Sequence, residues 1–140
     1  MRSTRLVLSR LFAPLLALVL PLLLVNSALA HHSFRAQYDA TKPIEVTGYV
    51  TKVEWTNPHV YIYVDIENVE GKIENWGFEL GPPHALQNNG WKKNTLEIGV
   101  QVDVSGTLAR DGSHNANARS VRLAGSDVRL GAASSEQLNR

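Results

Sequence analysis

The 140-residue sequence contains no cysteine. Disulfide bonds, thiolate nucleophiles and thiolate metal ligands are therefore excluded, and the fold must be stabilised by its core and its hydrogen bonds. The sequence also lacks the motifs G-x-S-x-G, H-E-x-x-H and the glycine-rich phosphate loop, which are typical of common hydrolases, zinc proteases and nucleotide-binding proteins. We therefore expect a binding protein, and we assign no catalytic residue.

The first thirty residues contain no acidic side chain. Arg2, Arg5 and Arg10 precede an apolar run from Leu11 to Val25, and the small-residue triplet Ala-Leu-Ala ends at Ala30. The run is shorter than the roughly 20 apolar residues that a membrane helix needs. A basic start, a short apolar run and an A-x-A ending are typical of a cleavable secretory signal peptide. We predict a signal peptide at residues 1–30 and a periplasmic or secreted mature protein.

Removal of this segment changes the charge of the chain. Cleavage leaves 110 residues with 11 basic and 13 acidic side chains, a formal charge of −2. A mildly acidic domain is a poor candidate for nonspecific nucleic-acid binding, which relies on Lys and Arg. We expect an N-terminal arm at residues 31–43, one folded domain at residues 44–130 and a flexible tail at residues 131–140, with no membrane span after cleavage.

The folded region consists mainly of alternating apolar and polar residues, which is the pattern of half-buried strands. The predicted strands lie at residues 44–55, 59–67, 72–80, 100–109 and 119–125. A shift in the alternation after Gly48 predicts a curved, bulged first strand. Pro82 and Pro83 begin a predicted short helix between strands 3 and 4. This order favours an all-β, five-stranded OB-type barrel, and a β-sandwich with a helical insertion is the alternative.

Several sequence blocks resemble one known protein family. They are HHSFRAQYD, GYVTKVEWTNPHVYIYVD, NWGFELGPPHAL, GW and ARDGS, and they extend from His31 to about Leu130. The most specific block is W-T-N-P-H, from Trp55 to His59. The resemblance is to a family of exported bacterial proteins known as domain of unknown function 6152. It implies a secreted single domain of β-barrel character and no settled activity, and the family pattern differs at His84.

Five histidines suggest a metal site. After cleavage His31 would carry a free α-amine, which with its ring Nδ1 chelates one ion, and a further imidazole would complete a three-nitrogen histidine brace. Neutral nitrogen donors suit Cu(II). We predict His59 as the further ligand and His84 as the next candidate, with His114 third. His32 offers another mode, in which the amine, a deprotonated amide and the His32 ring bind copper without any fold. The rival interpretation is that these histidines bind no metal.

The second candidate site is aromatic. Tyr61, Tyr63 and Asp65 alternate with apolar residues, and Trp55 lies just before them. Such a sheet face in OB-type barrels binds extended or planar ligands. The alternative function is therefore a metal-free module that binds a small ligand or an envelope protein through this face. The sequence leaves open whether the tyrosines belong to the core.

Overall fold

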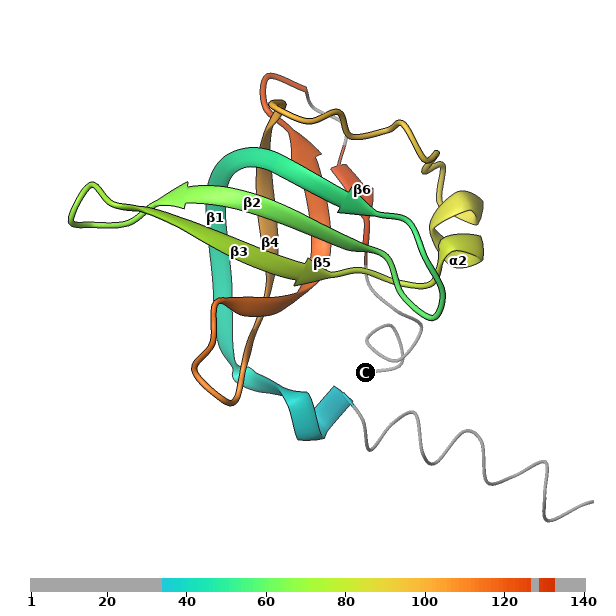
Figure 1. The fold of residues 1–140 in the computed structure, drawn as a ribbon. Coiled ribbons are helices and arrows are strands. Elements are labelled where there is room, and N and C mark those ends of the chain that lie inside the picture. Colours follow the sequence, from blue (N-terminus) through green and yellow to red (C-terminus); the bar gives the residue numbers. More distant parts are fainter. Residues whose placement is uncertain (1–33, 127–128, 133–140) are drawn as a thin grey trace, which may run out of the picture. The chain divides into compact units, whose positions relative to one another are not determined.

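The computed structural model describes residues 34–126 and 129–132. These residues form six strands, the short helix α2 and a helical turn before the first strand (Figure 1). Residues 34–37 are helical and lead directly into the first strand. The elements are β1 (Tyr38–Glu54), β2 (Tyr61–Glu67), β3 (Ile73–Glu79), α2 (Pro83–Asn88), β4 (Gln101–Ala109), β5 (Asn115–Leu123) and β6 (Arg129–Gly131). None of the described helices is long and apolar enough to cross a membrane.

Five of these strands close into a barrel. Strand β1 pairs antiparallel with both β2 and β4, while β2 pairs with β3 and β4 pairs with β5. The ring is completed by a short parallel contact in which Gly77 lies opposite Asn115 and Glu79 lies opposite Asn117. A meander of three strands, a helix and a hairpin closed in this way is the OB architecture. The predicted fold class and the position of the helix are confirmed.

Strand β1 belongs to both halves of the barrel, as its curvature in Figure 1 shows. Tyr49 is paired with Gln101 on one side and with Asp65 on the other. Gly48 lies at this crossing, where a Cβ atom would come 2.3 Å from the carbonyl oxygen of Asp65. The register then shifts between Val50 and Lys52. The predicted bulge is therefore present, and glycine is required because the two backbones approach so closely.

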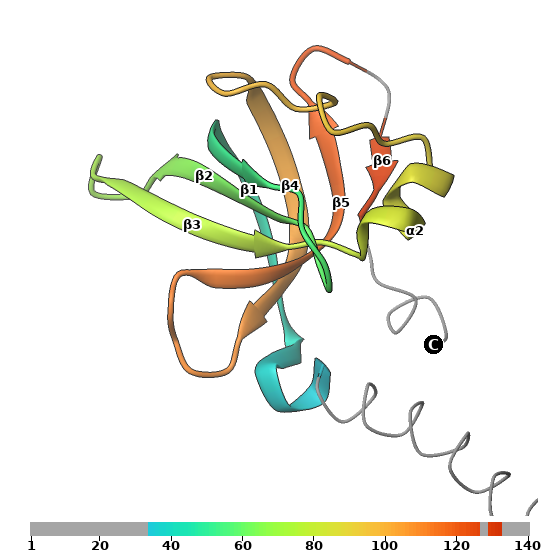
Figure 2. The same ribbon diagram turned by 45° about the vertical axis from the view of Figure 1, so that its right-hand side comes forward.

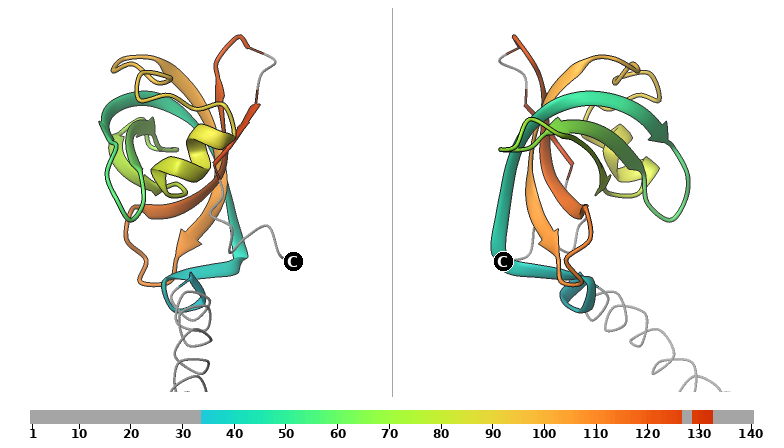
Figure 3. Two further views of the ribbon diagram at one scale, coloured as in Figure 1. Left: turned by 90° about the vertical axis from the view of Figure 1, so that its right-hand side faces the viewer. Right: turned by 60° about the vertical axis from the view of Figure 1, so that its left-hand side comes forward.

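The core lies inside the barrel and consists of side chains from all five strands of the ring. The helix α2 covers one end of the barrel (Figures 2 and 3). The alternation predicted for β2 is confirmed: Val60, Ile62 and Val64 are fully buried, whereas Tyr61 and Tyr63 are only partly buried. Leu86 of α2 is buried in the same cluster. Trp91 follows the helix, and its Nε1 donates a 3.0 Å hydrogen bond to the carbonyl of Gly131.

Three local predictions differ from the structure. The predicted arm at 31–43 overlaps β1, whose pairing is interrupted between Tyr38 and Pro43 and therefore shows no regular period. Residues 115–118 were expected in a hairpin loop but begin β5, where Ala116 and Ala118 are fully buried. Alanine and asparagine have weak strand propensity, so the local sequence does not reveal this strand, which is instead held by its pairing with β3 and β4. Residues near 129 form a separate strand, β6, which pairs with β5 outside the ring.

Replacement of Gly48 by Ala should destabilise the barrel, because the added methyl group would overlap the Asp65 carbonyl and the Val64 side chain. We expect a loss of at least about 2 kcal/mol in the free energy of unfolding, measured by urea denaturation. Gly131→Ala is the matched control, since nothing lies within 4 Å of its added Cβ, and it should change stability by less than about 0.5 kcal/mol. Equal stability of the two variants would contradict the close approach at Gly48.

Candidate functional site

The most unusual side chain in the barrel is the buried carboxylate of Glu79, which is only 6% exposed. It lies at the end of β3, directly opposite Tyr61 in the register. Its Oε2 accepts hydrogen bonds from the hydroxyls of Tyr38 at 2.5 Å and of Tyr61 at 2.9 Å. Its Oε1 lies 2.5 Å from Nδ1 of His59. A buried carboxylate is costly unless its oxygens are bonded, and here three donors from three segments satisfy it.

These contacts define the Glu79 cluster, which consists of Glu79, Tyr38, Tyr61 and His59. The first residue of β1 supplies one hydroxyl, the first residue of β2 supplies the other, and the turn between β1 and β2 supplies the imidazole. Burial, and then the neighbouring carboxylate, raises the pKa of both tyrosines above the ordinary value of 10.0. Both phenols therefore remain protonated donors across the neutral pH range.

His59 is oriented by this cluster. An ionised carboxylate only accepts hydrogen bonds, so the short contact places a proton on Nδ1 of the ring. The other nitrogen, Nε2, has no hydrogen-bond partner among the described residues, and 31% of the side chain is exposed. A histidine whose Nδ1 is held by a carboxylate while Nε2 remains free has the arrangement of a typical metal ligand. It is also the arrangement of a histidine that simply joins a turn to a buried acid.

A cleft of about 580 Å³ lies beside the cluster. One wall is formed by residues 36–38, and the rings of Tyr38 and Tyr61 contribute to its surface. A polar wall is formed by the end of β4, the turn that follows it and the first residue of β5, and its polar members are Arg110, Asp111, Ser113 and Asn115. The volume lies within the range of small-molecule sites. The cleft therefore adjoins the predicted Tyr61 but not the whole predicted face.

The other members of the predicted aromatic site have partners within the barrel. The hydroxyl of Tyr63 donates to Oε2 of Glu54 at 3.1 Å, and Nζ of Lys52 lies 5.0 Å from the centre of the Tyr63 ring. Asp65 accepts a 2.7 Å hydrogen bond from the side-chain amide of Asn75. Trp55 is half buried and packs against the core. The four predicted residues therefore do not line one common pocket.

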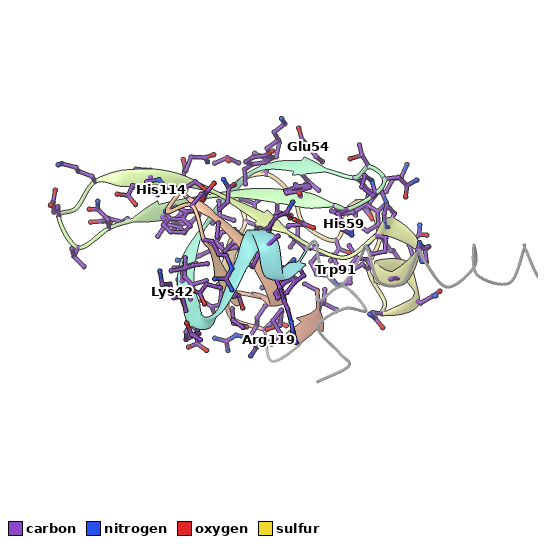
Figure 4. All side chains as sticks on the ribbon, turned by 90° about the horizontal axis from the view of Figure 1, so that it is seen from below. Lys42, Glu54, His59, Trp91, His114 and Arg119 are labelled. Carbon is purple, nitrogen blue, oxygen red and sulfur yellow. The ribbon has the colours of Figure 1, made fainter. Side chains whose placement is uncertain are left out.

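The remaining histidines lie apart from the Glu79 cluster or outside the described residues. His84 is exposed at the second position of α2. His114 stacks on Trp76, with ring centres 4.8 Å apart, and its Nε2 lies 3.6 Å from Glu74. Figure 4 shows His59 and His114 at well-separated places on the barrel. His31 and His32 lie outside the described residues, as does the predicted signal peptide.

Sequence reasoning missed two essential members of the site. Glu79 alternates with the buried Phe78 and Leu80, so its position predicts an exposed side chain on the outer face. Tyr38 falls in the stretch that we expected to be an arm. Glu79 could have been found only from its position opposite Tyr61 in the neighbouring strand. That position depends on the register between β2 and β3, which the sequence does not give.

Because the hydroxyls of Tyr38 and Tyr61 stay protonated in the folded protein, the free energy of unfolding should change with pH in the alkaline range. Unfolded tyrosines lose their protons near pH 10, whereas Tyr38 and Tyr61 retain theirs in the folded protein because their pKa values are raised. The unfolded state then binds fewer protons, so the free energy of unfolding falls as pH rises above about 10 and is unaffected by these groups below it.

Tyr38→Phe should make this fall shallower, by up to about 1.4 kcal/mol per pH unit above pH 10. It should also lower stability at neutral pH by about 1–3 kcal/mol through loss of a donor to Glu79. Urea denaturation between pH 7 and 11 measures both effects. Tyr49→Phe is the control, because Tyr49 is 53% exposed; if both variants followed the same pH profile, the buried hydroxyl of Tyr38 would have no special role.

Comparison with known proteins identifies a family and finds a structural likeness. The chain matches no curated protein. Among solved structures it resembles the mitochondrial single-stranded DNA-binding protein Rim1 of S. cerevisiae, at 8% sequence identity and a TM-score of 0.47, over 59% of this chain and 93% of that chain. The profile of a family of unknown function, DUF6152, matches residues 21–118. The expected family is thereby confirmed over most of the sequence, and the chain belongs to DUF6152, a family of unknown function.

Proposed function

We propose that the protein is an exported periplasmic binding protein that takes up Cu(II) through its mature N-terminal histidine and His59. The observation that carries the proposal is the state of the His59 ring: Nδ1 is engaged by the Glu79 carboxylate, and Nε2 is free beside solvent. Carboxylate-bound imidazoles of this kind are oriented for a metal and are stronger donors towards it. No reaction is assigned to the protein.

The other donors would come from His31 after signal-peptide cleavage. Its α-amine and ring Nδ1 form a chelate, and His59 would add the third nitrogen, a donor set that suits Cu(II). His31 is four residues before Arg35, so the chain length keeps it within about 14 Å of that residue. The next residues, Ala36 and Gln37, line the same cleft as Tyr61.

The described residues do not supply such a site by themselves. Within residues 34–126 and 129–132, no three His, Cys, Asp or Glu side chains gather in a way that could hold a metal ion. A folded copper site at His59 therefore requires donors from outside this part of the chain, which is the role proposed for His31. His84 is a poor further donor, because it is exposed on α2.

The alternative is a metal-free OB-type module that binds a small ligand or an envelope partner. The observation that favours it is the cleft of about 580 Å³ beside Tyr61, which has the volume of a small-molecule site. The two functions are compatible, because His59 and the cleft meet at the Glu79 cluster without sharing a side chain.

Copper titration of the mature protein tests the metal proposal. The protein should begin at His31 with no preceding residue, and Cu(II) binding is followed by calorimetry and EPR. We expect one tight equivalent, which weakens at least about tenfold in His59→Ala and is unchanged in His114→Ala. One alanine added before His31 should abolish the tight site, because it removes the free amine from the histidine.

Other results would overturn the proposal. Binding that is equal in wild type and His59→Ala would mean that the peptide HHS alone binds copper, through His31 and His32. Absence of tight binding would eliminate the metal function and leave the cleft as the functional feature. Circular dichroism of His59→Ala checks that the barrel is folded, as two tyrosine donors to Glu79 remain.

Glu79→Gln should also weaken Cu(II) binding, because an amide is a poorer acceptor for Nδ1 than a carboxylate and orients the ring less firmly. The expected loss is about 10–100-fold in affinity. Glu97→Gln removes an equal charge from an exposed position between α2 and β4 and serves as control. Identical affinities in the two variants would show that Glu79 has no influence on the metal.

A further inference from the structure

The cleft beside the Glu79 cluster has a surface of defined chemistry. Its only aliphatic lining side chains are Ala36 and Ala109, and every other lining side chain carries a polar atom. Pockets for lipids or other apolar ligands are lined mainly by apolar groups. A ligand that matches this cleft must therefore present several hydrogen-bonding groups beside any apolar face.

The aromatic element of the cleft is held in a fixed position. Tyr61 is half buried, and its hydroxyl donates to the buried carboxylate of Glu79 at 2.9 Å. The hydrogen bond holds the Tyr61 ring in place in the free protein. Ligand binding at this ring therefore costs little further loss of side-chain entropy. The face of an aromatic ring is electronegative, and it attracts the weakly positive C–H groups of a polyol ring.

The polar wall is also ordered before any ligand binds. Oδ1 of Asp111 accepts hydrogen bonds from the backbone amide and the hydroxyl of Ser113, at 2.9 and 2.6 Å. These bonds lower the pKa of Asp111, so its carboxylate is ionised at neutral pH. The side-chain amide of Asn115 donates to the same hydroxyl at 2.9 Å. Among the described residues, Oδ2 of Asp111 has no hydrogen-bond partner and is available to accept from ligand hydroxyls.

The charges around the cleft exclude a strongly anionic ligand. Arg110 is its only cationic lining residue, and the Nε of Arg110 already donates to the carbonyl of Arg35 at 2.7 Å. Asp111 lies on the same wall, and the Glu79 carboxylate lies at the hydroxyl end of the Tyr61 side chain. Nucleic-acid binding depends on several Lys or Arg contacts to phosphates, which this surface does not offer.

We propose that the cleft binds a neutral oligosaccharide. One sugar ring stacks its C–H face on Tyr61, while its hydroxyls donate to Asp111 and exchange hydrogen bonds with Asn115 and Gln37. The inference rests on the metal-free binding role proposed above and does not depend on copper. The ligand class follows from the anchored aromatic ring together with an ordered polar wall on which Asp111 balances the single cation, Arg110.

Chemical-shift mapping of the ¹⁵N-labelled mature protein tests this inference. The neutral probes are maltotriose, cellotriose and N,N′-diacetylchitobiose, and the contrasting probes are digalacturonic acid, an oligo(dT) and trialanine. We expect at least one neutral saccharide to shift the amides of residues 36–38 and 109–115 in the millimolar range. The contrasting probes should leave those amides unshifted.

Two variants test whether the saccharide binds in the cleft, and a third serves as a control for the loss of a negative charge. Ala36→Trp places a large ring in the cleft from an exposed position, so it should abolish the shifts without unfolding the barrel. Asp111→Asn keeps an acceptor for Ser113 but loses the charge, and it should weaken saccharide binding about tenfold. Glu97→Gln removes an equal charge from an exposed residue far along the chain from the cleft, and it should bind as wild type does.

Each contrary result has a distinct meaning. Shifts that persist in Ala36→Trp would place the saccharide elsewhere and overturn the assignment of the cleft. Shifts at the same amides with trialanine or oligo(dT), and none with the saccharides, would preserve the binding role but overturn the ligand class. If no probe shifts these amides, both the saccharide inference and the metal-free binding role at this cleft are wrong.

Discussion

The buried carboxylate of Glu79 joins segments that are far apart in the sequence. Its two oxygens receive hydrogen bonds from the start of β1, the start of β2 and the turn between these strands. Removal of any one donor leaves part of a buried charge unsatisfied, which costs more than an ordinary hydrogen bond contributes. Glu79 therefore links these strand ends, and it orients the side chains of Tyr38, Tyr61 and His59.

The same carboxylate shapes two surfaces. Through Oε1 it fixes the ring of His59 and leaves Nε2 towards solvent, and through Oε2 it anchors the Tyr61 ring in the wall of the cleft. A ligand at either surface would meet a group whose position is already determined. Preorganisation of this kind lowers the entropy cost of binding, which gives a physical reason for retaining a charge that an apolar side chain would replace at less cost.

Closure of the barrel limits the side chains at its crossings. Gly48 allows β1 to pass the Asp65 carbonyl, and Gly106 would place a Cβ atom 2.2 Å from the carbonyl of Asn117. Small buried residues at the start of β5 allow this strand to pair with β3. The pairing of Tyr38 with Ala109 places the β4–β5 turn beside the first residues of β1, and both segments line the cleft together with Tyr61.

The sequence by itself determined the alternation of β2, the bulge of β1 and the short helix between β3 and β4, because these features depend on neighbouring residues. It also selected His59 and Tyr61 from their place beside the turn. Only the tertiary structure revealed Glu79 and Tyr38, which are 41 residues apart. It likewise decided that residues 115–117 pair with β3. A contact across the barrel depends on strand register and closure, and no local pattern of residues encodes those.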